Sequence, residues 1–141
     1  MSTAARRYYL RGKAALDKGD VDGALEGLSA AVELSPRFVA ARLAYAAALA
    51  RRGDCPRAAQ TLRSGLSRSA SEIERGAMLA SLGDVLVRGG DFLGAEQAYA
   101  EIDGDSRFAA RAAAGRARVA AKTGRFAESF AALKLAADMA K

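Results

Sequence analysis

The feature that most constrains this chain is a short pattern, centred on glycine, that recurs four times. Successive glycines are separated by 34, 37 and 34 residues. The fifth residue after each glycine is small, and the ninth is large. The glycines are Gly19, Gly53, Gly90 and Gly124, the small residues are Ala24, Ala58, Ala95 and Ser129, and the large residues are Leu28, Leu62, Tyr99 and Leu133. Four copies in register within 141 residues predict an array of repeated structural units.

Each copy of the pattern predicts a pair of helices. At least 12 residues before every glycine are rich in Ala, Leu and Arg and contain no proline, which favours an α-helix. A glycine just past the last turn can adopt a left-handed conformation and end that helix. In three copies an Asp follows, and its carboxylate can accept hydrogen bonds from the first N–H groups of the next helix. Pro56 falls in a first turn, and Ser35-Pro36 closes the first pair.

The three additional residues between the second and third copies have a local explanation. Ser71 and Glu74 form a capping-box pattern, so the helix that follows begins about one turn early. Residues 103–106 predict the loop before the last pair of helices. We therefore expect an all-α fold of about eight helices in a single domain over residues 1–141.

These residues resemble the tetratricopeptide repeat (TPR), a 34-residue helix–turn–helix unit with small residues at three positions and a large one between them. The matching residues are Gly12, Ala24, Leu28, Ala31 and Pro36 in the first unit, Ala46, Ala58, Leu62 and Gly65 in the second, Gly83, Ala95 and Tyr99 in the third, and Ala117, Ser129, Leu133 and Ala136 in the fourth. The resemblance implies a right-handed α-solenoid of four repeats, at approximately 5–38, 39–72, 73–109 and 110–141. The small residues would let the two helices of a unit touch, and the large residue would fill the space beside them in the core.

Some residues depart from the TPR pattern. Ile102 occupies a position that is usually small, and Arg11, Arg42 and Arg116 occupy positions that are usually apolar. We expect either that these units are slightly rotated, or that the Arg stems lie along the surface with their charged heads in water.

The composition excludes several kinds of catalytic and metal site. The chain has no His and one Cys, which rules out imidazole-based triads, His metal sites and an intramolecular disulfide. Cys55 shares its repeat phase with Val21 and Phe92, which predicts a small core residue. The carboxylate pairs Glu72/Glu74 and Asp103/Asp105 lie at predicted helix starts or loops, and no phosphate-binding loop is present. We expect no enzymatic activity, no metal and no cofactor.

No segment of the sequence predicts a leader peptide or a membrane span. The N-terminal residues lack an apolar core of signal-peptide length. The longest apolar run, from Leu43 to Ala50, is far shorter than the roughly 20 residues that cross a bilayer. A single cysteine is compatible with a reducing compartment. We expect a cytoplasmic protein without membrane insertion.

The TPR resemblance also implies a binding surface, because the first helices of TPR units line a concave groove. Carried over, this groove contains Arg6, Tyr9, Lys13, Arg51, Asp84, Arg88, Arg111, Arg118 and Lys122. Seven basic residues then face two acidic ones, Asp17 and Asp84, in a chain of net charge +6. The alternative is that these are ordinary solvated charges on helix faces.

The basic groove predicts an adaptor, scaffold or assembly factor that binds another protein through an acidic or C-terminal segment with apolar residues. Two alternatives stay open: a secretion-type chaperone that cradles a subunit, and a single-stranded RNA-binding repeat protein. Nucleic acid is disfavoured, because base stacking requires an aromatic or planar Arg residue at a regular place in each repeat, and only Tyr9 clearly qualifies.

The last predicted helix carries two apolar stripes. Phe126, Phe130, Leu133 and Ala137 form one stripe, and Ala131, Leu135 and Met139 form the other. We expect the second stripe to be covered by a second copy of the chain or by a partner.

Overall fold

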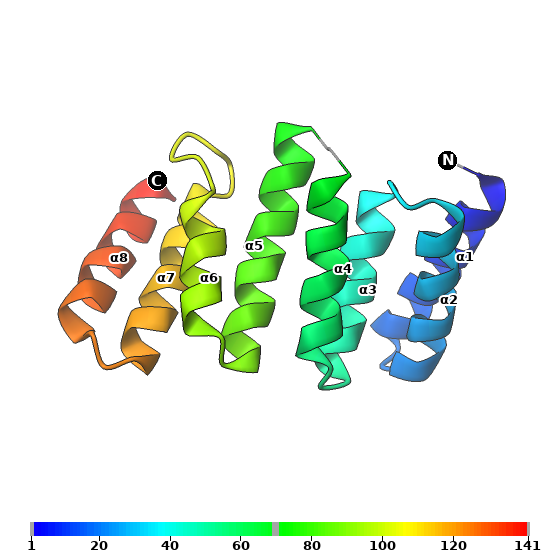
Figure 1. The fold of residues 1–141 in the computed structure, drawn as a ribbon, viewed down its shortest axis with the longest axis horizontal. Helices are drawn as coiled ribbons and strands as arrows, with labels where there is room; N and C mark the ends of the chain where they lie inside the picture. Colours follow the sequence, from blue (N-terminus) through cyan, green and yellow to red (C-terminus); the bar gives the residue numbers. More distant parts are fainter. Residues whose placement is uncertain (1, 69–70, 141) are drawn as a thin grey trace. The chain divides into compact units, whose positions relative to one another are not determined.

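The structure, a computed structural model, describes residues 2–68 and 71–140, with the backbone alone at 126–130. The chain divides into two compact units, Met1–Ala70 and Ser71–Lys141. Unit 1 contains α1 (Thr3–Asp17), α2 (Val21–Leu34), α3 (Val39–Arg51) and α4 (Cys55–Ser67). Unit 2 contains α5 (Glu72–Gly89), α6 (Phe92–Ala100), α7 (Ala109–Lys122) and α8 (Phe126–Met139). The described residues form these eight helices and no strand (Figure 1).

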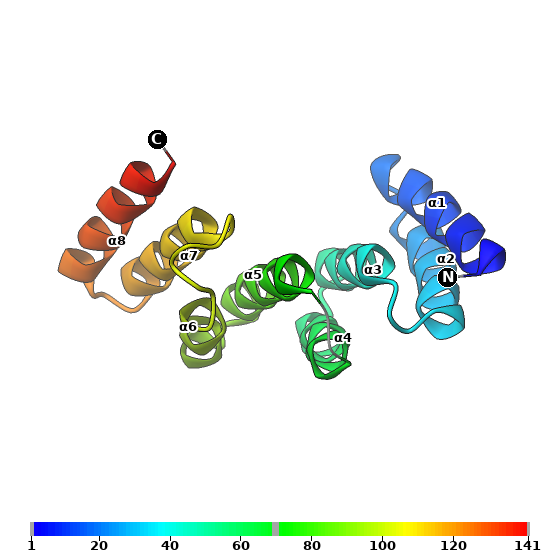
Figure 2. The ribbon, with the colours of Figure 1, turned by 90° about the horizontal axis from the view of Figure 1, so that it is seen from above.

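Within each unit, helices that follow one another along the chain pack side by side. In unit 1, α2 lies against both α1 and α3, and α4 lies against α3 (Figure 2). In unit 2, α6 lies against both α5 and α7, and α8 lies against α7. Each unit therefore consists of two helix–turn–helix pairs, as the repeat pattern predicts. The prediction of one domain over residues 1–141 stays a prediction.

The glycine-centred turns are confirmed. Gly19, Gly53, Gly90 and Gly124 all have positive φ angles, between 81° and 91°. After the first three glycines, Asp20, Asp54 and Asp91 accept a hydrogen bond from a backbone N–H of the next helix at 3.0, 3.3 and 2.9 Å. The fourth turn has Arg125 in the corresponding place, and α8 begins without a side-chain cap.

The predicted start of α5 and the predicted loop are also confirmed. Ser71 Oγ accepts from the backbone N–H of Glu74, and Glu74 Oε1 accepts from the backbone N–H of Ser71, each at 3.2 Å. This complete capping box begins α5 one turn earlier than the other repeats require. Residues 101–108 separate α6 from α7 and contain the predicted loop at 103–106.

Close helix approach through small residues defines the core. In unit 1, a Cβ atom added at Gly27 of α2 would lie 3.1 Å from the Cα atom of Gly12 in α1. In unit 2, the Tyr99 ring from α6 lies between Gly83 of α5 and Gly115 of α7, and a Cβ atom at either glycine would overlap it. Tyr99 is 1% exposed. The large residues of the first two repeats, Leu28 and Leu62, are equally buried.

Leu133 differs from the prediction that the large residue of each repeat fills the core. Its side chain is 54% exposed. The reason is that α7 is the only described helix that packs against α8, so one side of α8 is uncovered. Ser129, the small residue predicted for the same repeat, lies outside the described side chains.

Arg42 corrects the expectation that the unusual Arg residues keep their charged heads in water. Arg11 and Arg116 are exposed, but Arg42 is only 4% exposed. Its guanidinium donates to the carbonyl oxygens of Pro36 at 2.6 Å and Thr61 at 2.9 Å. These two acceptors replace part of the lost hydration and tie α4 to the α2–α3 loop.

Cys55 also differs from its prediction as a core residue. It is half-buried at the start of α4, as Val21 and Phe92 are at the starts of α2 and α6. The first residue of a helix here lies at the edge of the helix pair and is only partly covered by its neighbours.

The contact around Tyr99 yields a stability prediction. We expect Gly83→Ala and Gly115→Ala each to lower the free energy of unfolding by about 1–3 kcal/mol, because the new methyl group overpacks the site. Urea unfolding followed by circular dichroism measures this loss. Gly104→Ala is the matched control, since a Cβ atom at Gly104 meets nothing within 4 Å.

A double variant distinguishes crowding by Tyr99 from a general effect of replacing glycine in a helix. Tyr99→Leu introduces the residue type found at this repeat position in unit 1, and its side chain is shorter than the tyrosine ring. We expect Gly115→Ala to be less destabilising in the Tyr99→Leu background than in the original chain. Equal losses in both backgrounds would contradict the crowding explanation.

Candidate functional site

The predicted groove residues all lie on the first helix of a repeat. In unit 1 they belong to α1 and α3, and in unit 2 to α5 and α7. The seven basic residues among them are exposed, whereas Tyr9 and Asp84 are partly buried. Side chains of the predicted types are therefore accessible on these helices.

Asp84 is the centre of the most connected cluster on these helices. Its Oδ2 atom accepts from Nε and Nη2 of Arg111 at 3.2 and 2.7 Å, and its Oδ1 atom accepts from Nη2 of Arg118 at 3.0 Å. The Asp84 side chain is 33% exposed, and the two Arg side chains are 45% and 50% exposed. The carboxylate on α5 thus draws together two guanidinium groups about two turns apart on α7, and the three side chains carry a net charge of +1.

Tyr99, which the repeat pattern predicts only as a core residue, joins this cluster from α6. Its hydroxyl group passes between α5 and α7 and donates to Asp84 Oδ1 at 2.5 Å. Burial, followed by the hydrogen bond to Asp84, raises the pKa of the Tyr99 hydroxyl well above its ordinary value, and Arg118 opposes this shift. The sequence feature that could have indicated this contact is the polar hydroxyl group of Tyr99, because the other three large residues at this repeat position are Leu.

In unit 1 the predicted residues form smaller contacts. The Tyr9 ring packs against Phe38, with ring centroids 4.9 Å apart, and the Lys13 ammonium lies 5.9 Å from the Tyr9 centroid. This distance is within the range of a cation–π interaction. Arg51 Nη1 donates to the Leu16 carbonyl oxygen at the end of α1, at 3.3 Å.

Three of the predicted basic residues occupy one recurring structural place. Arg51, Arg88 and Lys122 lie in the last turns of α3, α5 and α7. A cation there interacts favourably with the partial negative charge at the helix C-terminus, by about 0.3–1 kcal/mol at an exposed site. These residues therefore have a role in the fold as well as a place on the candidate binding face. Arg6 and Lys13 lie nearer the start and the middle of α1.

Within the described part of the chain, no group of three or more His, Cys, Asp or Glu residues is placed to hold a metal ion. A cleft of about 180 Å³ at the start of α5 is lined by Glu72, Arg75, Gly76, Leu79, Glu101, Ile102, Asp103 and Ser106. Two of its three carboxylates already serve local structure, since Arg75 lies 3.7 Å from Glu101 and Asp103 accepts from the backbone N–H of Asp105.

The second apolar stripe of α8 is exposed in the described structure. The exposed fractions are 49% for Leu135 and 39% for Met139, and Ala131 is exposed as well. Leu135 and Ala131 also border a cleft of about 340 Å³ with Glu96, Ala113, Arg116, Ala120 and Ala132. Phe126 and Phe130, from the first stripe, lie outside the described side chains.

Comparison with known proteins identifies the family. The sequence matches the tetratricopeptide repeat family over residues 9–73 and 80–141, which is most of the chain. The chain therefore belongs to the tetratricopeptide repeat family. Proteins of this family are typically non-enzymatic modules that bind other proteins. No curated protein matches the sequence.

Solved structures show the same all-α helical-repeat fold. A MamA RS-1 ArsTM double mutant is 18% identical, with a TM-score of 0.80 over 99% of this chain and 76% of its own. MamA 41-end from Desulfovibrio magneticus RS-1 is 19% identical, with a TM-score of 0.79 over 99% and 77%. The Sgt2 TPR domain from Aspergillus fumigatus is 19% identical, with a TM-score of 0.73 over 88% and 82%. At these identities the likeness shows the fold alone.

Among the helices of the residues that have a described conformation, none combines the length and the hydropathy that crossing a lipid bilayer requires.

The raised pKa of Tyr99 yields a prediction about stability at alkaline pH. The unfolded chain loses this proton near pH 10, whereas the folded chain keeps it, so the unfolded state binds fewer protons above that pH. We expect the free energy of unfolding to fall above pH 10 by up to about 1.4 kcal/mol per pH unit from this group. Urea unfolding between pH 8 and about pH 11 measures it. Tyr99→Phe should lack this component, and an unchanged pH dependence in the variant would contradict the assignment.

The exposed stripe of α8 predicts self-association. We expect the weight-average mass from light scattering to rise with protein concentration, and Leu135→Glu to reduce this rise, because a charge would enter an apolar contact. Leu93→Glu is the matched control, since Leu93 on α6 is also exposed, at 70%. A strictly monomeric protein at high concentration, or equal effects of the two substitutions, would argue against this interface.

Proposed function

We propose that this protein is a non-enzymatic interaction module that holds an acidic, partly apolar peptide segment of another protein against the first helices of its repeats. The module would serve as an adaptor, scaffold or assembly factor. The family assignment supports the general class. The observation that supports an acidic segment is the pair of guanidinium groups that Asp84 positions on unit 2.

Asp84 prepares Arg111 and Arg118 for a second carboxylate without neutralising both of them. A guanidinium has five N–H donors. Asp84 occupies two donors of Arg111 and one nitrogen of Arg118, and both side chains keep about half of their surface in water. The salt bridges therefore reduce the freedom of the two side chains while leaving donors for a partner. Pre-positioned groups lose less conformational entropy on binding than free ones do.

The peptide would also contact uncharged parts of the same helices. On unit 2, Ala114 on α7 lies between Arg111 and Arg118 in sequence, one turn from each, and is partly exposed. On unit 1, the Tyr9 ring offers an aromatic surface beside the Lys13 ammonium. An acidic side chain next to a small apolar one would match either place. Charged residues would then set orientation and association rate, and apolar burial would provide much of the affinity.

Charge pairing can be tested with a labelled peptide. The probe is a fluorescein-labelled peptide of about twelve residues that alternates Glu and Leu, a length comparable to these helices. We expect Arg118→Gln to weaken peptide binding about tenfold in fluorescence anisotropy. The reason is that the half-exposed Arg118 guanidinium no longer pairs with a Glu carboxylate of the peptide. Arg116→Gln is the matched control, because Arg116 is an exposed residue of the same helix that lines the cleft on the α8 side.

Two further measurements complete this test. A peptide with Gln in place of Glu should bind more weakly than the acidic peptide, and its affinity should depend less on Arg118. Equal losses with Arg116→Gln and Arg118→Gln, or equal affinity for the Glu and Gln peptides, would contradict the proposed role of the cluster. Displacement of the peptide by an unstructured oligouridylate at lower concentration than by the unlabelled peptide would favour the RNA-binding alternative.

A further inference from the structure

The net positive charge of this chain comes entirely from unit 1. Residues 1–70 contain 12 Lys and Arg against 6 Asp and Glu, whereas residues 71–141 contain 10 of each. Within unit 1 the excess lies in residues 35–68, which contain seven Arg and a single acidic residue, Asp54. This segment comprises the α2–α3 loop, α3 and α4. The charge is thus concentrated in a segment of which only α3 is the first helix of a repeat.

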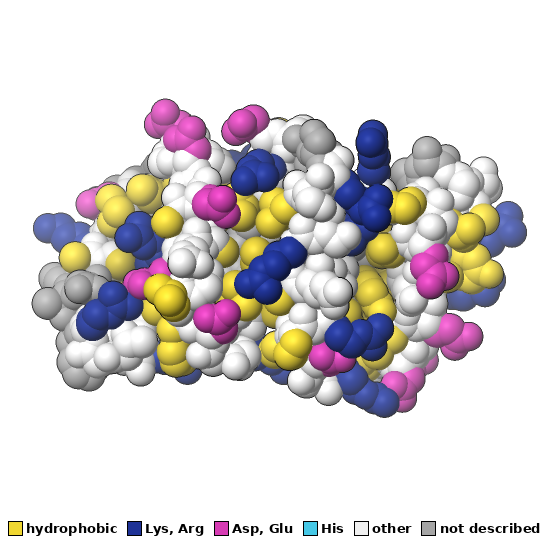
Figure 3. All heavy atoms as spheres, in the orientation of Figure 1, with side chains coloured by type: hydrophobic (Ala, Val, Ile, Leu, Met, Phe, Trp, Pro, Cys, Tyr) yellow, Lys and Arg dark blue, Asp and Glu magenta, His cyan; other side chains and the backbone are white. Residues whose placement is uncertain are grey.

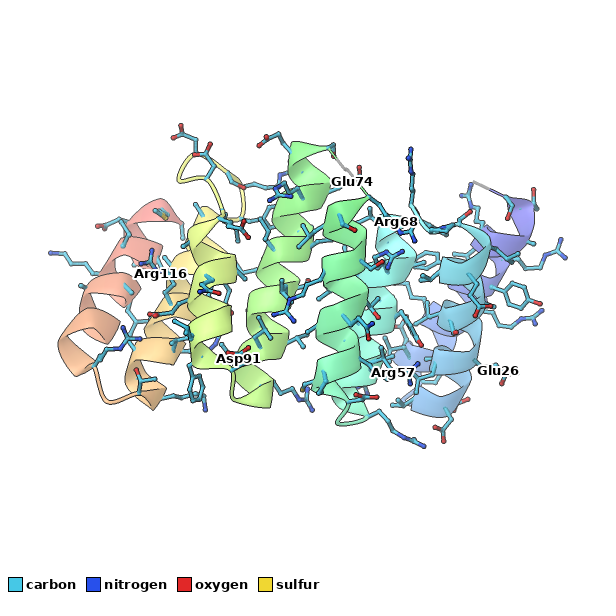
Figure 4. All side chains as sticks on the ribbon, viewed as in Figure 1. Glu26, Arg57, Arg68, Glu74, Asp91 and Arg116 are labelled. Carbon is cyan, nitrogen blue, oxygen red and sulfur yellow. The ribbon has the colours of Figure 1, made fainter. Side chains whose placement is uncertain are left out.

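The outer face of α4 displays this charge. The buried side of the helix consists of Ala58, Ala59, Leu62 and Gly65. The opposite side carries Pro56 in the first turn and six basic or uncharged polar residues: Arg57, Gln60, Arg63, Ser64, Ser67 and the C-terminal Arg68. We call these six residues the α4 face. Lys and Arg side chains flank α4 in Figure 3, and Figure 4 shows Arg57 and Arg68 towards its two ends.

Most of this charge has no counter-charge among the side chains that are described. Among the described side chains, no carboxylate lies within ion-pair distance of Arg63 or Arg68. Arg57 is 3.8 Å from Asp54 and donates to the Tyr45 hydroxyl at 3.1 Å. Asp54 is partly engaged in capping α4. Of the three guanidinium groups on α4, only that of Arg57 therefore lies within ion-pair distance of a carboxylate among the described side chains.

The buried guanidinium of Arg42 adds to the positive potential beneath this face. It is bound by two carbonyl oxygens and by no carboxylate among the described residues. Burial, and then the charge of the nearby Arg68, lower the pKa of Arg42. Repulsion between these two like charges, one of them buried, raises the free energy of the isolated chain. An anion bound at Arg68 would relieve this repulsion.

The side-chain types on the α4 face discriminate between anionic partners. Guanidinium, hydroxyl and amide groups are the donors with which proteins contact phosphate oxygens. No large exposed apolar side chain lies on α4, which disfavours both a membrane surface and a protein interface with an apolar core. No aromatic residue lies on α4, so bases could not stack there as they do in single-strand binding.

We propose that the α4 face binds the phosphate backbone of a double-stranded nucleic acid, independently of base sequence. Arg57 and Arg68 are 11 residues apart, so about 16 Å of helix separates them. The major groove of B-form DNA is about 12 Å wide. A helix that crosses this groove places its two terminal Arg side chains at the phosphates of opposite strands, with Arg63 and the serines between them. This surface is distinct from the first-helix faces that carry the proposed peptide site.

Binding of a fluorescein-labelled 20-base-pair DNA duplex to the full chain tests this proposal. Anisotropy is measured at several salt concentrations for the original chain and for the double variant Arg63→Gln/Arg68→Gln. Each lost phosphate contact should reduce the slope of log K against log salt by about 0.9, so we expect a reduction of about 1.8. At the lowest salt concentration, we expect about tenfold weaker binding.

The matched control is Arg7→Gln/Arg11→Gln. Both residues are exposed on α1 of the same unit, and the change in net charge is identical. We expect this control to keep the original slope and to lose less than about twofold in affinity, since only long-range charge changes. Circular dichroism establishes that all variants keep their helices. Arg118→Gln should weaken peptide binding by the same factor in the original chain and in the Arg63→Gln/Arg68→Gln variant. This independence separates the proposal from the proposed function.

Three results would overturn the proposal. The first is absence of duplex binding at low salt. The second is an equal loss in both double variants, which would mean that net charge alone attracts DNA. The third is stronger displacement of the duplex by polyglutamate or by vesicles containing phosphatidylserine than by unlabelled duplex, which would assign the α4 face to an acidic protein or an anionic membrane.

Discussion

Close contact between helices at glycine and alanine is the interaction on which each unit depends. A pair of helices joined by a two- or three-residue turn gains little from propensity alone, and its stability comes from packing. Gly12 and Gly27 bring α1 and α2 together almost backbone to backbone. In unit 2 the glycines instead make room for a large side chain between two helices. Gly83 on α5 and Gly115 on α7 leave a space that the Tyr99 ring fills. The same residue type thus serves two packing arrangements in one repeat family.

The arginine residues divide according to what the fold does with them. Arg42 is taken into unit 1, where it connects a loop to α4. Arg111 and Arg118 are held at the surface by Asp84, and Arg51, Arg88 and Lys122 complement helix ends. Arg63 and Arg68 have no carboxylate partner among the side chains that the structure describes. A count of charges therefore says little about binding until each charge is placed against its neighbours.

Two kinds of surface follow from the repeat architecture. The first helices expose side chains that the neighbouring helices constrain, as Asp84 of α5 constrains Arg118 of α7 on unit 2. Such positioned groups suit recognition of a specific segment. The α4 face has Arg side chains at intervals along the helix with uncharged polar residues between them, and no large exposed apolar side chain. That arrangement suits a repetitive polyanion. The different chemistry of the two surfaces is the reason to assign them different partners.

The sequence alone determined the features that depend on neighbours close along the chain. The left-handed glycines, the Asp caps and the Ser71–Glu74 capping box follow from contacts within about four residues, and all of them could be predicted. The repeat phase also placed the nine groove residues on first helices. Tertiary structure alone decided that Arg42 is buried, that Tyr99 reaches Asp84, and that Leu133 is exposed. The Arg42–Thr61 and Tyr99–Asp84 contacts join residues 19 and 15 positions apart, and the exposure of Leu133 depends on whether another helix covers it. Helix periodicity carries no information about either.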